Sequence, residues 1–284
     1  SITNYGSIVA TTTDYQQCQD RLTSGLIGAI LKTILATQTV VFIGYSLSDS
    51  DFSAIYEFVK AQMNSLHKQA YVVTPFVEDC EKFGAAGFIP IRTDGSYFIA
   101  QVKAHAVAQG DLLDDDIFDS AQELLYSVQD EHELLHDTVK ASAFPEMIFA
   151  ASYQDGLMHA LERAIKMKGS GKYSHRCEVI GVANAYLKLQ KEKLKRGVYE
   201  DVAYIDGYIN GLTHLLMTKE ERSSVRVPMY FVFGTKDEIS GVAGFIDFFK
   251  KSPAIHKAAH KRALAYLNRL TDPESAEFHH PPWL

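Results

Sequence analysis

The sequence has few cysteines, no excess of basic residues and no long apolar run. Cys18, Cys80 and Cys177 lie far apart without a CxxC pair, which argues against a disulfide framework and a thiolate zinc site. Such cysteine usage is typical of the reducing cytosol, so we expect a cytoplasmic protein. The formal charge of -7 offers nucleic acid no general attraction. No apolar stretch reaches the roughly 20 residues that cross a bilayer, so no membrane contact is expected.

The composition is that of a globular protein. Apolar residues make up 46% and charged residues 22% of the 284 positions, enough for one large core or two ordinary ones. The chain starts at Ser1 without an initiator methionine, inside SITNYGSIVATTTDY, which has the pattern of a loop and a strand. We therefore expect it to be the downstream part of a longer protein.

The first hundred residues alternate between strand and helix patterns. Residues 11–38 place Leu22, Leu26, Ile30 and Ile34 at helical spacing, and the continuous run TVVFIG that follows predicts a strand buried on both faces. Further strands are expected at AYVVTP and FIPIRTD, and further helices at 51–68, 77–87 and 96–109. Strands and helices that alternate with short connections predict a parallel sheet covered on both faces.

The pattern changes in the acidic stretch after Gly110, where we place a domain boundary. The predicted domains are residues 1–110 and 111–284. Most of the second reads as helix, at about 112–130, 131–142, 145–167, 174–195 and 198–220. The apolar segment VPMYFVFGT predicts one strand, and helices through GFIDFFKK and AIHKAAHKRALAYLNRL follow it.

The segment GYSLSDSDF follows the predicted strand TVVFIG directly. In parallel sheets, ligands bind where such turns lead into the next helix. Gly44 lets a ligand approach the backbone, Ser46 and Ser48 offer hydroxyls, and Asp49 and Asp51 offer carboxylates to ribose hydroxyls. The alternative is that Ser48, Asp49 and Ser50 only cap the next helix.

The segment FIGYSLSDSDF, preceded by GSIVATTTDY and followed by AYVVTP and GFIPIRTD, resembles the carboxyl half of the Sir2-like domain, closest to the divergent bacterial group of anti-phage defence. The resemblance covers roughly residues 1–108. It implies an α/β fold with a partial, Rossmann-like parallel sheet, followed by a mainly α-helical domain. The residues that it implies for NAD contact are Gly44, Tyr45, Ser46, Leu47, Ser48, Asp49, Thr74 and Thr93, with Val73 and Asp94 beside the last two.

The resemblance also implies what the chain lacks. The family's glycine-rich phosphate loop, catalytic asparagine and catalytic histidine precede this turn, so we expect them upstream of Ser1 and assign no catalytic residue here. Protein-deacetylating members carry a four-cysteine zinc module before the turn, whereas residues 1–43 hold only Cys18. We therefore expect no zinc and no metal ligand, with NAD as the substrate.

The implied function of the parent protein is NAD+ glycohydrolysis to nicotinamide and ADP-ribose in anti-phage defence. The expected partners are NAD+, further copies in a homo-oligomer, and a partner ATPase or a phage-derived trigger. The alternative is a non-catalytic sensor of NAD or ADP-ribose with the same fold.

Three other segments allow different interpretations. HELLH, residues 132–136, matches H-E-x-x-H and would suit a zinc metallopeptidase, with Glu146 or Glu162 as third ligand. Its charged neighbours favour a solvated helix face instead. GSGKYS, residues 169–174, lacks the first P-loop glycine and favours a helix connection. In the proline-rich tail we expect His279, His280 and Trp283 to dock on a neighbouring subunit rather than bind metal.

Overall fold

The computed structural model describes residues 25–44, 68–233, 241–251, 257–270 and 278–282, and the isolated positions 13, 20, 56–57, 60–61 and 238–239. The chain divides into two compact units, residues 1–105 and 106–284, and each is described by itself. The boundary at Gly110 that we predicted remains a prediction. Across the described residues, no helix combines the length and apolar character that a membrane span requires.

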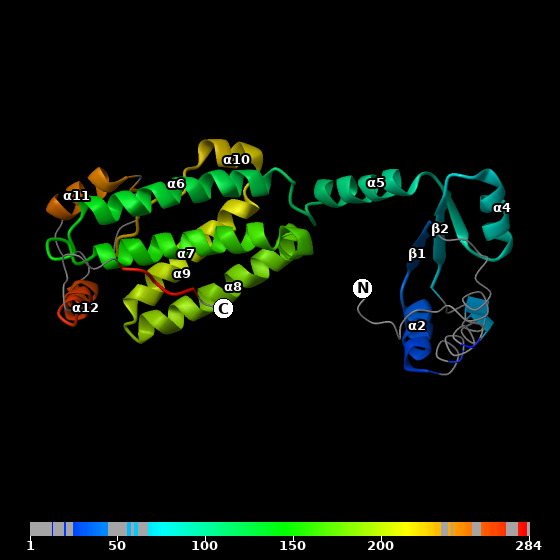
Figure 1. Cartoon of the computed structure of the whole chain (residues 1–284), viewed down its shortest axis with the longest axis horizontal. Coiled ribbons are helices and arrows are strands. Elements are labelled where there is room, and N and C mark those ends of the chain that lie inside the picture. Colours follow the sequence, from blue (N-terminus) through cyan, green and yellow to red (C-terminus); the bar gives the residue numbers. More distant parts are fainter. Residues whose placement is uncertain are drawn as a thin grey trace. The chain divides into compact units, whose positions relative to one another are not determined.

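The first unit contains a parallel sheet. Its strands are β1 (Val40–Ile43), β2 (Ala70–Thr74) and β3 (Ile89–Arg92), in the order β1-β2-β3. Ile43 pairs with Val73, and Thr74 pairs with Arg92, so all three strands end at the same edge (Figure 1). The predicted α/β class with a parallel sheet is confirmed.

Three helices with described bounds lie in this unit or begin in it: α2 (Leu26–Thr37), α4 (Val77–Ala85) and α5 (Gly95–Ala108), whose last three residues lie beyond residue 105. The core is small and centres on aromatic rings, because Phe88 stacks on Tyr56 at 4.4 Å and meets Phe42 and Phe83 edge-on. Its buried members are Leu35, Tyr56, Ala70, Val72, Phe83 and Phe88.

Two expectations for this unit are wrong. β1 is not buried on both faces, because it is an edge strand of the described sheet and exposes Val41 and Ile43 by 41% and 43%. The apolar stripe expected on α2 also faces away from the core: Leu26 and Ile30 are exposed. The helix instead packs through Leu35, with Leu31 beside it.

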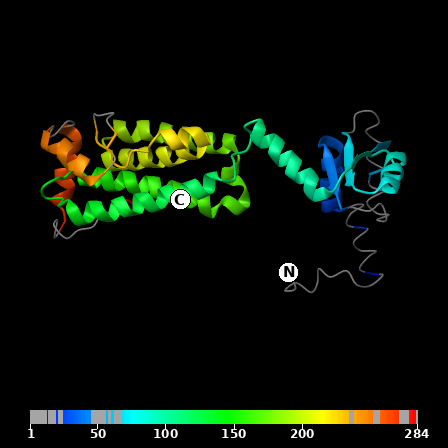
Figure 2. The ribbon, with the colours of Figure 1, turned by 90° about the horizontal axis from the view of Figure 1, so that it is seen from above.

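The second unit is helical, as expected. Its long helices are α6 (Ile117–Thr138), α7 (Met147–Lys166), α8 (Arg176–Lys195) and α9 (Tyr199–Leu216). α7 packs along α9, while α6 lies on α7 and α8 on α9, and Figures 1 and 2 show the four side by side. The shorter helices are η3 (Lys168–Ser170), η4 (Lys172–Ser174), α10 (Lys219–Ser224), α11 (Val242–Lys251) and α12 (Lys257–Leu267).

Glycines bring α7 and α9 into backbone contact. A Cβ added to Gly156 would lie 1.9 Å from the carbonyl oxygen of Tyr204, and one added to Gly207 would lie 1.9 Å from that of Tyr153. The two positions are reciprocal, because each helix presses a bare Cα against the main chain of the other. No larger residue fits at this crossing, so these glycines set the distance between the central helices.

Two expectations for the second unit need correction. The helices expected at 112–130 and 131–142 form one helix, α6. The strand expected at VPMYFVFGT is not formed in its described residues, 227–233, which contribute only an isolated bridge between Tyr230 and Ile239. Phe231 and Phe233 pack on Tyr153 and Phe149 of α7 instead. The apolar alternation here serves packing on helices rather than a strand ladder.

Candidate functional site

A pocket of about 790 Å³ lies at the edge of the sheet where the strands end. Parallel sheets bind their ligands at this edge, and the volume is that of a typical small-molecule site. Its lining comes from the ends of β1 and β2 and from the starts of α4 and α5. The lining residues are Ile43, Gly44, Val73, Thr74, Pro75, Phe76, Asp79, Asp94, Gly95, Ser96 and Ile99.

Gly44 ends β1 with a φ of +69°, a left-handed conformation in which a side chain is strained. No described atom would lie within 4 Å of a Cβ placed there. Its conformation therefore favours glycine, and the described residues around it leave its backbone open toward the pocket. Both observations agree with a turn that a ligand approaches closely.

Thr74 ends β2 with a hydroxyl that already has two partners. Its Oγ1 accepts a hydrogen bond from the backbone N–H of Phe76 and donates one to Oδ2 of Asp79, both at 3.4 Å. The residue is 6% exposed. Its first role is therefore to fix the turn from β2 into α4, which places Phe76 and Asp79 at the pocket.

Asp94 caps α5. Its Oδ1 accepts hydrogen bonds from the backbone N–H groups of Ser96 at 2.8 Å and Tyr97 at 3.1 Å. An aspartate in this position satisfies amides that a helix leaves without partners. A Cβ at Gly95 would lie 2.6 Å from Cγ2 of Ile43, so glycine is needed where α5 starts against the end of β1. The cap and the close approach together place Asp94 and Ser96 at the pocket.

The predicted NAD-binding residues have different outcomes. Gly44 and Thr74 line the pocket, and so does Asp94 beside Thr93. Thr93 itself is half-buried outside the lining, and its N–H donates to the carbonyl of Thr74 at 3.1 Å. The five others, Tyr45, Ser46, Leu47, Ser48 and Asp49, lie outside the described residues, so their assignment remains a prediction.

Sequence reasoning missed Phe76, Asp79 and Ser96. Phe76 is 65% exposed at the pocket and offers an aromatic face of the kind on which bases stack. A signal for Asp79 and Ser96 existed, because both lie in the first turn of a helix that starts just after a strand. The described lining contains two carboxylates and no lysine or arginine, which suits sugar hydroxyls better than phosphates.

The HELLH motif lies on α6, and only Glu133 and Leu134 of it lie on a solvated face. His132 is 7% exposed and Leu135 is fully buried, so the expectation of a solvated face is wrong for these two positions. Neither glutamate suggested as a third ligand lies in this cluster: Glu146 pairs with His260, and Glu162 lines another pocket beside His159. Asp155 and His279 lie next to His132 instead.

The tail docks on its own unit. The backbone N–H of His280 donates to Oδ2 of Asp155 at 2.6 Å, its Nε2 lies 3.0 Å from Oδ1 of Asp201, and its ring stacks on Tyr204 at 4.2 Å. Docking on a neighbouring subunit remains a prediction, and Trp283 lies outside the described residues.

A parallel sheet with a pocket at its carboxyl edge and a left-handed glycine after β1 is the arrangement of an α/β domain with a candidate ligand site. Residues 1–89 match the family model of the SIR2-like domain, so the predicted SIR2-like recognition is confirmed for this part of the chain. The SIR2-like domain belongs to a superfamily of NAD-dependent enzymes, and the match supports an NAD-related role. Among curated proteins and among solved structures, nothing matches the chain.

Proposed function

We propose that the first unit is the NAD-binding part of an NAD+ hydrolase, which releases nicotinamide and leaves ADP-ribose. The observation that carries this proposal is the pocket beside Gly44 at the ends of the strands. Seven of its eleven lining residues, from Ile43 to Asp79, lie in the segment 1–89 that matches the SIR2-like domain, and the other four, from Asp94 to Ile99, follow that segment. A pocket at this edge is where a doubly wound fold holds a dinucleotide.

The pocket residues suit the sugar and base of such a ligand. The carboxylates of Asp79 and Asp94 accept hydrogen bonds from ribose hydroxyls, and the ring of Phe76 offers a stacking face to a purine. Cleavage of the bond between nicotinamide and ribose develops positive charge on the ribose, so catalysis depends on holding the sugar in place and stabilising that charge. We assign the first task to these residues and no catalytic role to any residue of this chain.

We extend the proposal to bacterial anti-phage defence. An enzyme that consumes NAD+ endangers its own cell, so its activity has to be gated. The helical second unit is the natural place for such a gate, through homo-oligomerisation, a partner ATPase or a phage-derived trigger. The support for this step is the resemblance of FIGYSLSDSDF to the defence group of SIR2-like domains.

Binding is tested by titrating the protein calorimetrically with NAD+ and with ADP-ribose. Asp94→Asn keeps a side chain that caps helices but loses the charge. Since hydrogen bonds to charged groups are worth about 1 kcal/mol more than neutral ones, we expect roughly fivefold to tenfold weaker binding. Glu78→Gln removes an exposed charge of α4 outside the pocket lining and should bind like the parent. Equal affinity of Asp94→Asn and the parent would refute the site.

Hydrolysis is tested by following nicotinamide release chromatographically, with the natural full-length protein alone and with an extract of phage-infected cells. Release under either condition supports the hydrolase. Binding of NAD+ without release under both conditions favours the alternative, a non-catalytic sensor of NAD or ADP-ribose.

A further inference from the structure

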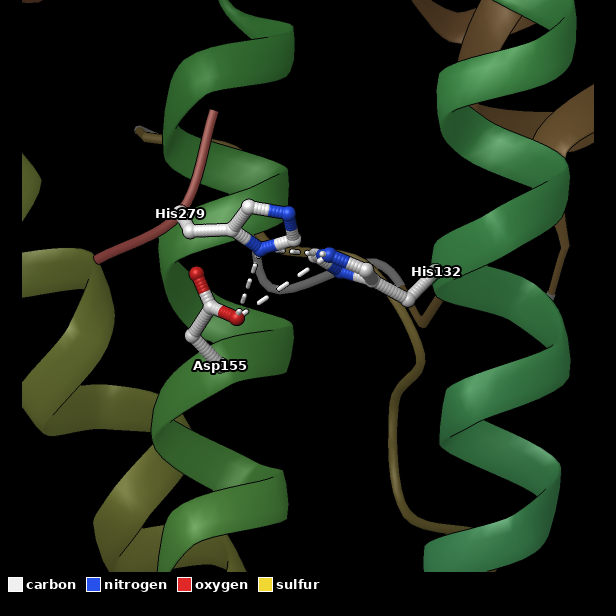
Figure 3. A group of neighbouring side chains, drawn as sticks. All are labelled: His132, Asp155 and His279. Carbon is white, nitrogen blue, oxygen red and sulfur yellow. Dashed lines mark hydrogen bonds and ion pairs between the residues drawn. The ribbon is translucent and has the colours of Figure 1, made fainter. Parts of the chain in front are cut away.

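Three side chains from distant parts of the second unit converge beside the HELLH motif. His132 comes from α6, Asp155 from α7 and His279 from the segment 278–282 (Figure 3). His132 and Asp155 are buried, while the side chain of His279 is 57% exposed. Two imidazoles and a carboxylate are the donors that first-row transition metals take from proteins.

The separations of the three facing atoms suit one metal ion. Nε2 of His132 lies 3.4 Å from Nδ1 of His279 and 3.9 Å from Oδ1 of Asp155, and those last two atoms are 3.7 Å apart. Taken as the sides of a triangle, these separations put one point at about 2.1 Å from all three atoms. That distance equals the length of a zinc–nitrogen or zinc–oxygen bond in proteins.

Outer contacts orient the ring of His132 for this role. The amide nitrogen of Gln154 donates to the carbonyl of Met229 at 3.0 Å, which turns its Oε1 toward Nδ1 of His132 at 3.1 Å. Since Oε1 can only accept, Nδ1 carries the proton and Nε2 presents its lone pair to the cluster. Metal-bound histidines in proteins have this arrangement, in which the second ring nitrogen donates to a fixed oxygen.

Asp155 is oriented in a similar way. Its Oδ2 accepts the backbone N–H of His280 at 2.6 Å, and Oδ1 faces the two imidazoles (Figure 3). The tail that supplies His279 is therefore also the tail that positions the carboxylate. The site forms only when the segment 278–282 lies against α7.

We propose that His132, Asp155 and His279 bind one divalent transition-metal ion, with zinc as the expected metal, and that the ion fastens the C-terminal segment to α6 and α7. A further coordination position opens to a pocket of about 660 Å³ lined by Glu133, His136 and His279, among others, which gives the ion a path from solvent. The ligand set differs from that of an H-E-x-x-H metallopeptidase, because Asp155 and His279 join His132. It also differs from a thiolate zinc module, which the cysteines exclude.

The binding test uses the whole chain, stripped with a chelator and titrated with zinc against a chromophoric competitor. One equivalent should bind. Loss of an outer contact of a metal site lowers metal affinity roughly 10- to 100-fold, and His279→Ala, which removes a direct ligand, should lower zinc affinity by more. This variant leaves the two buried ligands in place. Asp155→Asn should lose as much, because it keeps an acceptor for His280 but removes the charge. His175→Ala removes an exposed imidazole of the same unit and should bind like the parent.

Circular dichroism before titration verifies that each variant is folded, and His279→Ala decides the outcome if Asp155→Asn is not. Two imidazoles and one carboxylate also suit iron(II), so a parallel anaerobic titration with iron(II) identifies the preferred metal. Binding of neither metal by the parent, or unchanged affinity in His279→Ala, overturns the proposal.

Fastening of the tail is tested by hydrogen exchange of the amides of Phe278, His279 and His280, with and without one equivalent of zinc, since residues 281 and 282 are prolines without an N–H. Zinc should slow exchange at least tenfold in the parent and His175→Ala, and leave it unchanged in Asp155→Asn. Equal exchange in the parent with and without bound zinc would refute the fastening. NAD+ takes no part in these measurements, so they succeed or fail independently of the proposed hydrolase.

Discussion

The crossing of α7 and α9 makes Gly156→Ala the sharpest test of the fold. The new methyl carbon would lie 1.9 Å from the carbonyl oxygen of Tyr204, 2.8 Å from its carbonyl carbon and 3.0 Å from the nitrogen of Tyr208. Cβ atoms essentially never come closer than 3.0 Å to such neighbours, so the helices have to separate by about 1 Å. The atoms in the way belong to the main chain of a helix and cannot rotate aside.

The magnitude follows from two opposing effects. Overpacking costs about 1–3 kcal/mol and sometimes more, and a gap approaching 1 Å removes a quarter to a half of each dispersion contact along the crossing. The higher helix propensity of alanine relative to glycine adds up to about 1 kcal/mol to the free energy of unfolding. We expect a net loss of about 2–4 kcal/mol, which for a unit of this size lowers the melting temperature by roughly 5–15 °C.

The assay is thermal and urea unfolding of the whole chain, followed by circular dichroism at the helical signal. Gly181→Ala is the matched control, because Gly181 lies within α8 and no atom of the described residues lies within 4 Å of its added Cβ. This control should gain up to about 1 kcal/mol of stability. A Gly156→Ala variant whose stability lies within roughly 0.5 kcal/mol of the parent, the usual effect of a surface substitution, would refute the close crossing.

Two further predictions concern pH and the ligand turn. Burial, with charge from Arg222, lowers the pKa of His214 to about 4. Between pH 6.5 and 4 this histidine therefore binds a proton in the unfolded chain but not in the folded chain. The free energy of unfolding should therefore decrease by at most about 3 kcal/mol as the pH is lowered over this range. Urea unfolding of the parent and of His214→Gln should show a smaller decrease in the variant. Parallel curves of stability against pH would contradict the assignment. Ser46→Ala should weaken NAD+ binding in calorimetry without changing the melting temperature, and unchanged affinity would remove Ser46 from the site.

The sequence predicted the type of most elements, because their patterns are local. The parallel sheet, α7, α8 and α9 appear where periodicity placed them. The burial of β1 was wrong, because a run such as Val41 to Ile43 looks alike in an edge strand and a central one. The segment 227–233 was wrong because its aromatic residues pack on α7, a long-range contact that alternation cannot reveal.

The candidate sites show the same limit. Gly44 was found because it follows a strand directly, which is a local property, and Thr74 was found through the resemblance to the Sir2-like domain. Asp155 and His279 were not connected with His132, because they lie 23 and 147 positions away along the chain. The sequence HELLH alone does not indicate which of its side chains faces the core or which residues of other elements contact it there.

The anchoring of His280 has a consequence for the continuity of the chain. Its backbone is hydrogen-bonded to Asp155, and its imidazole contacts Asp201 and Tyr204. The segment around His280 therefore packs on α7 and α9, which lie much earlier in the sequence. If a protease cleaved one peptide bond between α11 and α12, the two fragments would therefore remain non-covalently associated in solution. Only a denaturing gel would reveal the nick.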